Sequence, residues 1–159
     1  MKLLVMSDSH KTIDHMRFAV GQESPDAIIH LGDHISDARK LKALFHDTTF
    51  HVVTGNCDYP AGGENELFLT LDNVNILVTH GHKYGVKSGI ASLIERARGL
   101  GANVALYGHT HHASLRFEYG IWFLCPGQMQ HIIKHHPASY GVVSVDGANT
   151  ECRIEMLQA

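Results

Sequence analysis

Short apolar runs alternate with segments of helical periodicity over the first third of the chain. The runs at 3–6, 27–31 and 50–53 are mostly apolar, which predicts buried β-strands. Between them, residues 13–20 and 35–45 carry apolar side chains at the three- and four-residue spacing of an amphipathic helix. This alternation of strand and helix is typical of an α/β layer with parallel strands.

The remainder of the chain predicts more strands and one more helix. Residues 60–66 have the composition of an exposed loop, and a helix is predicted at 90–100. Because the segments after residue 112 alternate or form hairpins, we expect antiparallel strands in a second sheet that faces the first. The predicted strands are 67–71, 74–79, 104–107, 115–119, 121–124, 140–145 and 151–157. The fold class is therefore α/β, a four-layer α/β/β/α sandwich of two mixed sheets, in a single domain of residues 1–159.

Candidate capping residues mark the helix boundaries. Thr12, Ser36 and Ser88 precede or begin the helical segments, and their hydroxyls can accept a hydrogen bond from the first helical turn. Gly21 is expected to contribute to the end of the first helix. Gly101 is expected to end the last one, because glycine adopts the left-handed conformation at helix ends.

Residue types that can bind metal ions follow several of the predicted strands. Asp8 and His10 come directly after the first run, and an extended backbone would direct both side chains to the same side. In α/β sheets, ligands bind beyond the carboxyl ends of the strands. The candidate ligands at these ends are Asp8, His10, Asp33, Asn56, His80, His109 and His111.

Two carboxylates, one amide oxygen and four imidazoles are too many donors for one tetrahedral site. They suit two cations that share a carboxylate about 3.5–4 Å apart, as in two-metal hydrolases. Nitrogen and oxygen donors without a thiolate favour Mn2+, Fe2+, Zn2+ or Ni2+ over Ca2+ or Mg2+. Gly32, Gly55, Gly81 and Gly108 each lie beside a candidate ligand, which predicts sharp turns and close backbone approach there.

Composition narrows the class of protein. With 159 residues, of which 44% are hydrophobic, the chain can bury a core, and its net charge of -3 gives no general attraction to nucleic acid or membranes. Cys57, Cys125 and Cys152 show no C-x-x-C spacing, which favours a reducing compartment. The first apolar run is too short for a signal peptide, and no run approaches the roughly 20 residues of a membrane span. We therefore expect a soluble, cytoplasmic protein that does not bind membranes.

Five motif blocks follow one another along the chain. They are Asp8-x-His10, Gly32-Asp33, Gly55-Asn56-x-Asp58, His80-Gly81-His82 and Gly108-His109-Thr110-His111. In this order they resemble the calcineurin-like metallophosphoesterases, and in particular the small YfcE-type phosphodiesterases, over nearly the whole chain. The resemblance implies the metallo-dependent phosphatase fold and a hydrolase that acts on phosphoric ester bonds.

The resemblance also implies a role for each candidate ligand. Asp33 would bridge two divalent ions, for which Mn2+ is favoured and Ni2+, Zn2+ and Fe2+ are the alternatives. A hydroxide between the ions would attack phosphorus in line with the leaving oxygen. The first ion would be held by Asp8, His10 and His111, and the second by Asn56, His80 and His109. Asn56 can bind through its carbonyl oxygen while its amide NH2 reaches a phosphate oxygen.

Cys57 stands where the larger phosphatases of the superfamily carry a histidine as leaving-group acid. A thiol with a pKa near ~8.5 is a poorer acid than imidazolium at neutral pH, which predicts a preference for diesters or good leaving groups. A buried filler is the alternative for Cys57. Asp58 is expected to orient a ligand histidine, and His82 to face substrate or support the site. We take Asn56, Cys57, Asp58 and His80 as the catalytic candidates.

These patterns predict a dinuclear metal-dependent phosphodiesterase whose partners are small phosphodiesters or phosphorylated small molecules. One alternative is a non-catalytic scaffold, as in the retromer subunit of this fold, although the filled ligand positions favour an enzyme. A nuclease is the other alternative. The sequence shows no basic stripe with interleaved aromatic residues, so nucleic acid polymers are not expected as partners. Relatives form dimers or tetramers, which implies a homodimer or homotetramer.

Overall fold

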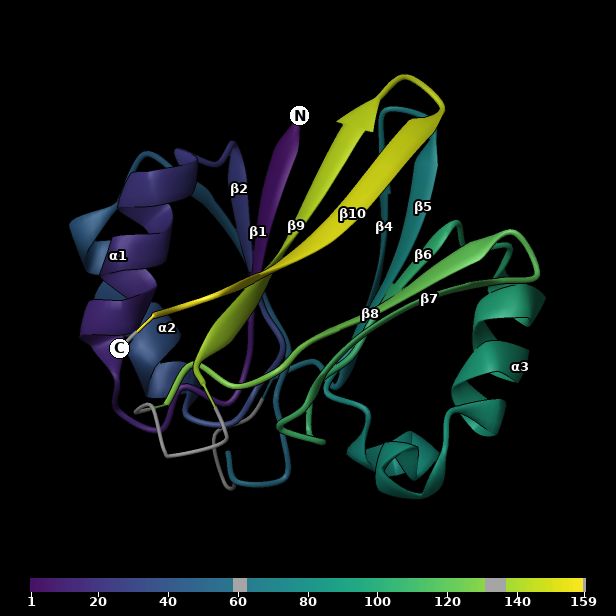
Figure 1. The fold of residues 1–159 in the computed structure, drawn as a ribbon, viewed down its shortest axis with the longest axis horizontal. Coiled ribbons are helices and arrows are strands. Elements are labelled where there is room, and N and C mark those ends of the chain that lie inside the picture. The colour runs from purple at the N-terminus through teal and green to yellow at the C-terminus, as the bar shows by residue number, and fades with distance from the viewer. Residues whose placement is uncertain (59–62, 131–136, 159) are drawn as a thin grey trace.

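Two β-sheets lie face to face between helices in the computed structural model, which describes residues 1–58, 63–130 and 137–158. The helices α1 (Ile13–Glu23) and α2 (Ile35–Leu44) cover the outer face of one sheet, and α3 (Ala91–Leu100) covers the outer face of the other (Figure 1). The predicted four-layer α/β/β/α sandwich of two mixed sheets is confirmed.

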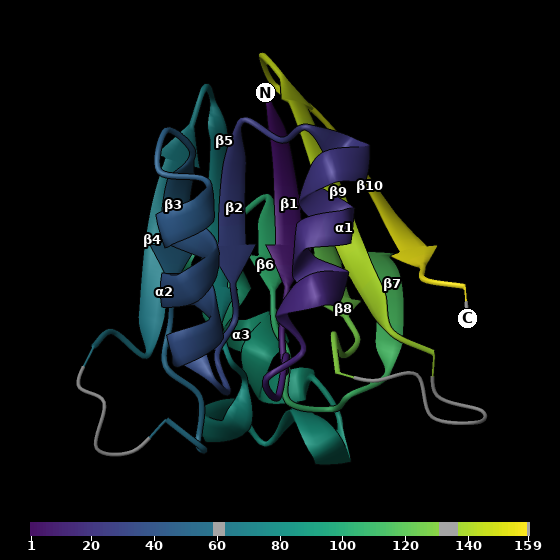
Figure 2. The same cartoon turned by 90° about the vertical axis from the view of Figure 1, so that its left-hand side faces the viewer.

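The first sheet combines a parallel half with an antiparallel hairpin. Its strand order is β10-β9-β1-β2-β3, with β1, β2 and β3 parallel to one another and β9 antiparallel to β1. Figure 2 shows α1 and α2 in front of this sheet. The strands are β1 (Lys2–Met6), β2 (Ala27–His30), β3 (Thr49–Val52), β9 (Ser139–Asp146) and β10 (Asn149–Met156).

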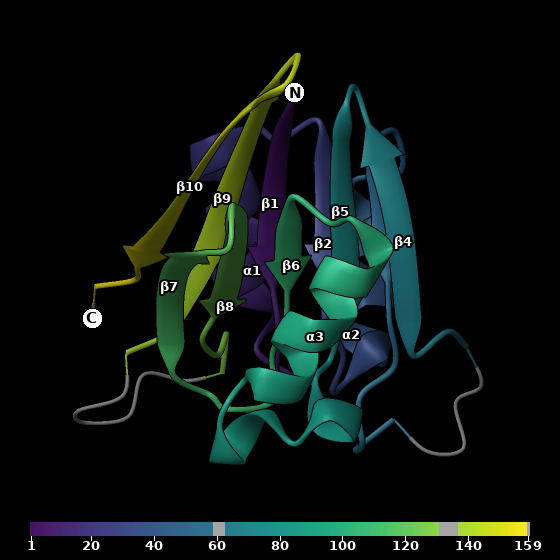
Figure 3. The same cartoon turned by 90° about the vertical axis from the view of Figure 1, so that its right-hand side faces the viewer.

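The second sheet also mixes strand directions, in the order β4-β5-β6-β8-β7. Its central strands β5, β6 and β8 are parallel, and β4 and β7 pair antiparallel at the edges. Figure 3 shows α3 in front of this sheet. The strands are β4 (Glu66–Leu71), β5 (Val74–Thr79), β6 (Val104–Leu106), β7 (Ala113–Glu118) and β8 (Ile121–Pro126).

The last hairpin belongs to the first sheet, which differs from the sequence expectation for the segments after residue 112. Strand β9 pairs with β1, with Leu4 opposite Val142. The burial pattern explains this placement, because almost every residue of β9 is buried, on both faces of the strand. Such a strand needs neighbours on both sides, and β1 and β10 provide them. Strand β10 alternates between exposed and half-buried residues, as an edge strand does.

Alternation along β1 divides its side chains between two layers of the core. Leu3 and Val5 lie in the core between the sheets, whereas Leu4 and Met6 pack with α1 and α2 on the outer side. All four are fully buried, because β1 lies in the middle of its sheet and is covered on both faces. A third cluster fills the space between the second sheet and α3, around Leu93 and Phe123.

The helix boundaries correct several of the predicted caps. The residue before α2 is His34, in the left-handed conformation, and the residue before α3 is Ile90, so Ser36 and Ser88 are not N-caps. Thr12 does precede α1, but its side chain makes no capping hydrogen bond. Gly101, at φ 69°, ends α3 as predicted.

Two further segments need correction. The helix α1 continues through Gly21 to Glu23, because Ser24 adopts the left-handed conformation that ends it. Of the predicted loop 60–66, residues 60–62 lie outside the described residues, 63–65 are exposed, and Glu66 begins β4. Among the helices that the structure describes, none is long and apolar enough to cross a bilayer.

A buried carboxylate attaches the last hairpin to α1. Glu23, 8% exposed, accepts hydrogen bonds from the Tyr140 hydroxyl at 3.0 Å and from Arg153 at 2.7 Å. Replacing Glu23 with alanine removes the acceptor of the Tyr140 hydroxyl and one of the two carboxylates that Arg153 contacts, so we expect a loss of about 2 kcal/mol in the free energy of unfolding. Urea denaturation of Glu23→Ala measures this loss, with exposed Glu95→Ala of α3 as the control. Equal stabilities of the two variants would contradict this account of the hairpin.

Candidate metal centre

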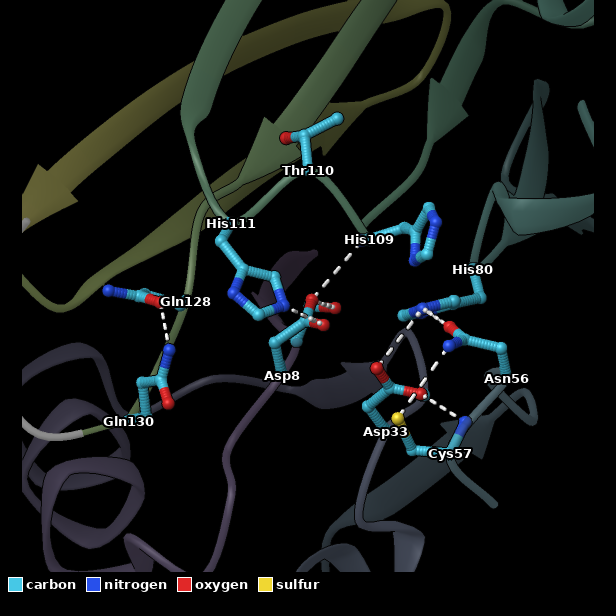
Figure 4. Close-up of polar contacts among 12 residues, drawn as sticks. Asp8, Asp33, Asn56, Cys57, His80, His109, Thr110, His111, Gln128 and Gln130 are labelled. Atoms are coloured by element: carbon cyan, nitrogen blue, oxygen red, sulfur yellow. Dashed lines mark hydrogen bonds and ion pairs between the residues drawn. The ribbon is translucent and has the colours of Figure 1, made fainter. Parts of the chain in front are cut away.

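The candidate ligands meet where the two sheets face each other, at one end of the molecule. The loops after β1 and β2 come from the first sheet, and those after β5 and β6 come from the second. Figure 4 shows that side chains from these loops, and from the loop after β3, point toward one another. Residues far apart in the chain, such as Asp33 and His109, therefore offer ligand atoms within 4.8 Å of one another, and we call the space between these side chains the pocket.

A first group of four residues offers ligand atoms that all lie within 4.8 Å of one another. Its members are Asp8, His10, Asp33 and His111. Asp8 Oδ1 lies 3.1 Å from His111 Nε2. Within the described part of the chain, however, neither Asp8 Oδ1 nor His10 Nε2 has a hydrogen-bond partner, and both atoms are buried. Orphaned oxygen and nitrogen atoms of this kind fit a divalent cation.

A second group consists of Asp33, His80 and His109, again with ligand atoms within 4.8 Å of one another. His80 Nδ1 lies 2.7 Å from the Leu31 carbonyl oxygen. Because a carbonyl can only accept, Nδ1 carries the proton, and Nε2 presents its lone pair to the pocket in the neutral ring. Nε2 lies 3.4 Å from Asp33 Oδ2 and 3.1 Å from Asn56 Oδ1. The Asn56 oxygen therefore faces the same point as the histidine.

Asp33 belongs to both groups. Its side chain is almost completely buried, and the Cys57 amide donates a hydrogen bond of 2.9 Å to its Oδ1. Burial alone would raise the pKa of the Asp33 carboxyl. The nearby His80 ring and the hydrogen bond from the Cys57 amide outweigh that effect and hold the pKa of Asp33 below its ordinary value. Asp33 is therefore ionised at neutral pH and contributes a negative charge between the two groups.

The histidines divide according to the charges that they face. Burial lowers the pKa of His10 and of His109, so these rings are neutral and available as ligands. The neighbouring Asp8 carboxylate raises the pKa of His111. Burial opposes protonation of His80, but the carboxylates of Asp33 and Asp8 raise its pKa. The pocket therefore attracts positive charge, a proton or a metal ion, where the carboxylates lie.

Left-handed backbone carries most of the candidate ligands. The expectation that Asp8 and His10 leave an extended strand together is wrong, because their φ angles are +53° and +44°. The strand ends at Met6, and the two side chains reach the pocket from a tight turn. The candidate ligands with positive φ are Asp8, His10, Asp33, His109 and His111.

The glycines beside the ligands allow the loops to touch, as the sequence predicts. A Cβ on Gly32, at φ +101°, would lie 2.5 Å from the Gly55 nitrogen. A Cβ on Gly55 would collide with the side chain and amide of Asp33. The loops after β2 and β3 are thus in direct backbone contact, which places Asn56 beside Asp33.

Asp58 supports this contact through backbone rather than through a histidine ring. Its carboxylate accepts hydrogen bonds from the amides of Asp33 at 2.7 Å, Gly55 at 2.8 Å and Ile35 at 3.0 Å. The expectation that Asp58 orients a ligand histidine is therefore replaced. Asp58 lies outside both ligand groups and fixes the loops that carry Asp33 and Asn56.

Cys57 lies at the rim of the pocket with an exposed thiol, so it is not a buried filler. Asn56 Nδ2 lies 3.6 Å from its sulfur. Partial burial raises the pKa of the Cys57 thiol, and the Asp33 carboxylate raises it further. The thiol therefore stays protonated at neutral pH and is a weak acid.

Other histidines flank the two groups. The His82 ring lies 5.4 Å from the His80 ring and 6.1 Å from the His109 ring, measured between centroids. The His34 ring lies 4.6 Å from that of His10. Both are beside the pocket without belonging to either group of ligands.

Sequence reasoning missed a buried polar network behind the Asp8 loop, formed by Ser9, His30 and Asp37. His30 is fully buried and accepts a hydrogen bond from the Gly32 amide. Asp37 gives no sequence signal of its own, because an acidic residue in the first turn of a helix is ordinary on an exposed surface. Only the fold shows that it is 1% exposed.

Comparison with known proteins agrees with this geometry. The family model of the calcineurin-like phosphoesterase superfamily domain matches residues 1–148. The chain belongs to this superfamily. The probable metallophosphoesterase YsnB of Bacillus subtilis (strain 168) is 32% identical over 148 residues, which cover 92% of this chain and 85% of YsnB. The family expected from the five motif blocks is therefore confirmed.

Solved structures share the fold over almost the whole chain. A phosphoesterase predicted in Streptococcus pneumoniae TIGR4 superposes with a TM-score of 0.80 at 29% identity, covering 98% of this chain and 88% of that one. The phosphoesterase YfcE of E. coli superposes with a TM-score of 0.69 at 22% identity, over 91% and 88% of the two chains. Vps29 of Entamoeba histolytica in complex with Zn2+ gives a TM-score of 0.73 at 19% identity, over 98% and 99%. At such identities YfcE and Vps29 show the fold alone.

The buried neutral His30 makes acid stability a test of the network. Burial lowers the pKa of His30 from 6.5 to about 4. Below pH 6.5 the unfolded chain binds a proton at this position that the folded chain does not bind, so stability falls as pH drops toward 4. For the metal-free protein, we expect the wild type to lose about 3 kcal/mol more than His30→Gln between pH 7 and pH 4.

Urea denaturation in the presence of a chelator, repeated across this pH range, measures the difference. His46→Gln is the control, because the His46 side chain is 77% exposed. The control should follow the wild-type slope. A His30→Gln variant with the same slope as the wild type would show that His30 is not buried as a neutral ring.

Proposed function

We propose that this chain is a dinuclear metal-dependent phosphoesterase that hydrolyses small phosphodiesters. The observation that carries the proposal is the position of Asp33 in both groups of ligand atoms. A carboxylate between two such groups suits two cations that share it. Asp8, His10 and His111 would hold one ion, Asn56, His80 and His109 would hold the other, and Asp33 would contact both.

The ligand chemistry supports divalent transition metals in this site. When bound, such ions lower the pKa of water and neutralise the charge of phosphate oxygens. The imidazole and oxygen donors, with no thiolate in either group, favour Mn2+, with Ni2+, Zn2+ and Fe2+ as alternatives. The orphaned Asp8 Oδ1 and His10 Nε2 support the first ion in particular.

The chain's own groups would orient the phosphate. Asn56 points its oxygen toward His80 Nε2, which leaves its amide NH2 on the open side of the pocket. An NH2 group in that position can donate to a phosphate oxygen of a bound ester. Asn56 and Cys57 are exposed, so a substrate can approach the pocket from their side.

The weak acid at the rim supports a preference for diesters. An alkyl monoester needs a proton donor for its leaving oxygen, and the Cys57 thiol, with its raised pKa, donates poorly. A diester with a good leaving group, such as an aryl oxide, depends less on that proton. Small phosphodiesters are therefore the substrate class that we propose.

A non-catalytic scaffold is the second candidate, because Vps29 structures share the fold. Metal content alone does not separate the two functions, since Vps29 itself has been solved in complex with Zn2+. Hydrolysis does separate them. We expect a screen of mono- and diesters with Mn2+, Ni2+, Zn2+ and Mg2+ in parallel to give metal-dependent turnover of aryl diesters.

Two results of this screen would contradict the proposed phosphodiesterase. Turnover of no ester with any of the four metals would favour the scaffold. Faster cleavage of single-stranded DNA than of any small diester would identify a nuclease. A phosphodiesterase of small substrates requires the reverse order.

Asp33→Asn tests the shared carboxylate. Asparagine tolerates the left-handed backbone at this position, at φ +61°, so the substitution removes charge with little backbone strain. We expect diesterase kcat to fall roughly 100-fold or more and both ions to bind more weakly. Steady-state kinetics and elemental analysis after gel filtration measure the two effects.

Asp14→Asn is the control for this variant, because the Asp14 side chain is 87% exposed. It should retain wild-type activity and metal content. An Asp33→Asn protein that keeps both ions and its rate would contradict the bridging role.

Cys57→His tests whether the missing acid limits monoester hydrolysis. An imidazole at this exposed position can donate the proton that the thiol donates poorly, so we expect kcat for an alkyl monoester to rise about tenfold or more. Cys57→Ala separates the gain of an imidazole from the loss of the thiol and should leave monoester turnover unchanged. Equal monoester rates in Cys57→His and Cys57→Ala would show that this position does not reach the leaving group.

A further inference from the structure

A buried network lies behind the turn that presents Asp8 and His10. Its three polar side chains, Ser9, His30 and Asp37, are each at most 1% exposed. They belong to neither group of ligand atoms. A buried polar group without a hydrogen-bond partner destabilises the fold, so the hydrogen bonds among these three side chains are needed to keep them buried.

The hydrogen bonds in the network have a defined direction. The Gly32 amide donates to His30 Nδ1 at 3.2 Å, so Nδ1 is unprotonated and the ring proton of neutral His30 is on Nε2. Nε2 then donates to Ser9 Oγ at 3.1 Å, and the Ser9 hydroxyl donates to Asp37 Oδ2 at 2.8 Å. His30 thus joins the loop of Asp33 to the loop of Asp8.

The same Asp37 oxygen also holds the backbone of the Asp8 loop. The amide of Lys11 donates to Asp37 Oδ2 at 2.7 Å. Asp8, His10 and Lys11 have φ angles of +53°, +44° and +69°. Left-handed backbone costs a non-glycine residue roughly 1–2 kcal/mol, so three such residues in four need an outside contact that holds them. Asp37 provides two, one through Ser9 and one through Lys11.

We propose that Asp37 is a positioning residue for the first cation. By accepting hydrogen bonds from Ser9 and from Lys11, it holds the left-handed turn in which Asp8 Oδ1 and His10 Nε2 point into the pocket. This inference rests on the proposed two-metal function. It adds Asp37, a residue outside both ligand groups. Only the first of the two ions would depend on Asp37.

The selectivity follows from which loops Asp37 touches. The second ion would be held by Asn56, His80 and His109, which come from loops that Asp37 does not contact in any described hydrogen bond. The loop of Asn56 is instead fixed by Asp58, through the amide of Gly55. Loss of Asp37 should therefore weaken the first ion and spare the second, whereas a general loss of packing would weaken both.

The test follows the two pairs of histidine rings separately during a Zn2+ titration. Ring nitrogen NMR shifts report His10 and His111 for the first ion, and His80 and His109 for the second. Asp37→Leu keeps the side-chain size but removes both acceptors. We expect the first pair to need roughly tenfold more Zn2+ than in the wild type. The second pair should stay within about twofold of the wild type, because no described hydrogen bond joins the Asp37 side chain to the loops that carry it.

Three further variants sharpen the result. Asp37→Asn retains a side-chain oxygen as acceptor, and Asp37 Oδ1 has no described partner to lose, so the first pair should stay within about threefold of the wild type. Ser9→Ala removes one of the two hydrogen bonds that Asp37 accepts, together with the acceptor of His30 Nε2, and should shift the first pair by an intermediate factor. It also keeps the proposal testable if Asp37→Leu does not fold. Asp47→Asn, with its side chain 94% exposed, is the control and should match the wild type.

The outcomes separate this proposal from the function on which it rests. If no ring shifts in the wild type, the proposed metal centre is wrong, and the positioning role falls with it. If both pairs shift in the wild type, equal weakening of the two pairs in Asp37→Leu overturns the positioning role alone. So does the absence of any weakening, and so does an Asp37→Asn protein that is as impaired as Asp37→Leu.

Discussion

The burial of two carboxylates in one pocket is the constraint on which the rest of this site depends. Asp8 and Asp33 are at most 2% exposed, and removing two like charges from water is costly unless compensating charge lies between them. The described hydrogen bonds to these groups are few, and Asp8 Oδ1 has none. The facing sheets bring four imidazoles to the same place, and a pocket of this composition is suited to cations rather than to an apolar ligand.

The architecture could be predicted from the sequence because local hydrophobic periodicity indicates most of its strands and helices. Apolar runs and helical spacing locate almost every element, and the rule that ligands bind beyond the carboxyl ends of strands brings the candidate residues together. The sheet to which β9 and β10 belong was not accessible, because pairing with β1 is a contact between the two ends of the chain. Local pattern carries no information about such a partner.

The sequence also did not predict the side chains that act by accepting hydrogen bonds from the backbone. Asp37 and Asp58 look like ordinary acids of a helix and a loop in the sequence, yet both are buried and accept hydrogen bonds from main-chain amides. Their roles depend on loops that meet only in the folded protein. Fold alone does not decide function either, since Vps29 shares these layers. The two ligand groups, and not the shared layers, favour an enzyme.

The left-handed turns have a consequence for how such a pocket should be probed. Five of the candidate ligands occupy backbone that alanine adopts reluctantly. An alanine substitution would therefore remove a metal ligand and distort its loop at the same time. The measured loss of activity would not distinguish the two effects. Asparagine and glycine enter this region of conformational space more readily. A scan with these two residues would report the chemistry of the lost donor with less interference from a collapsed turn.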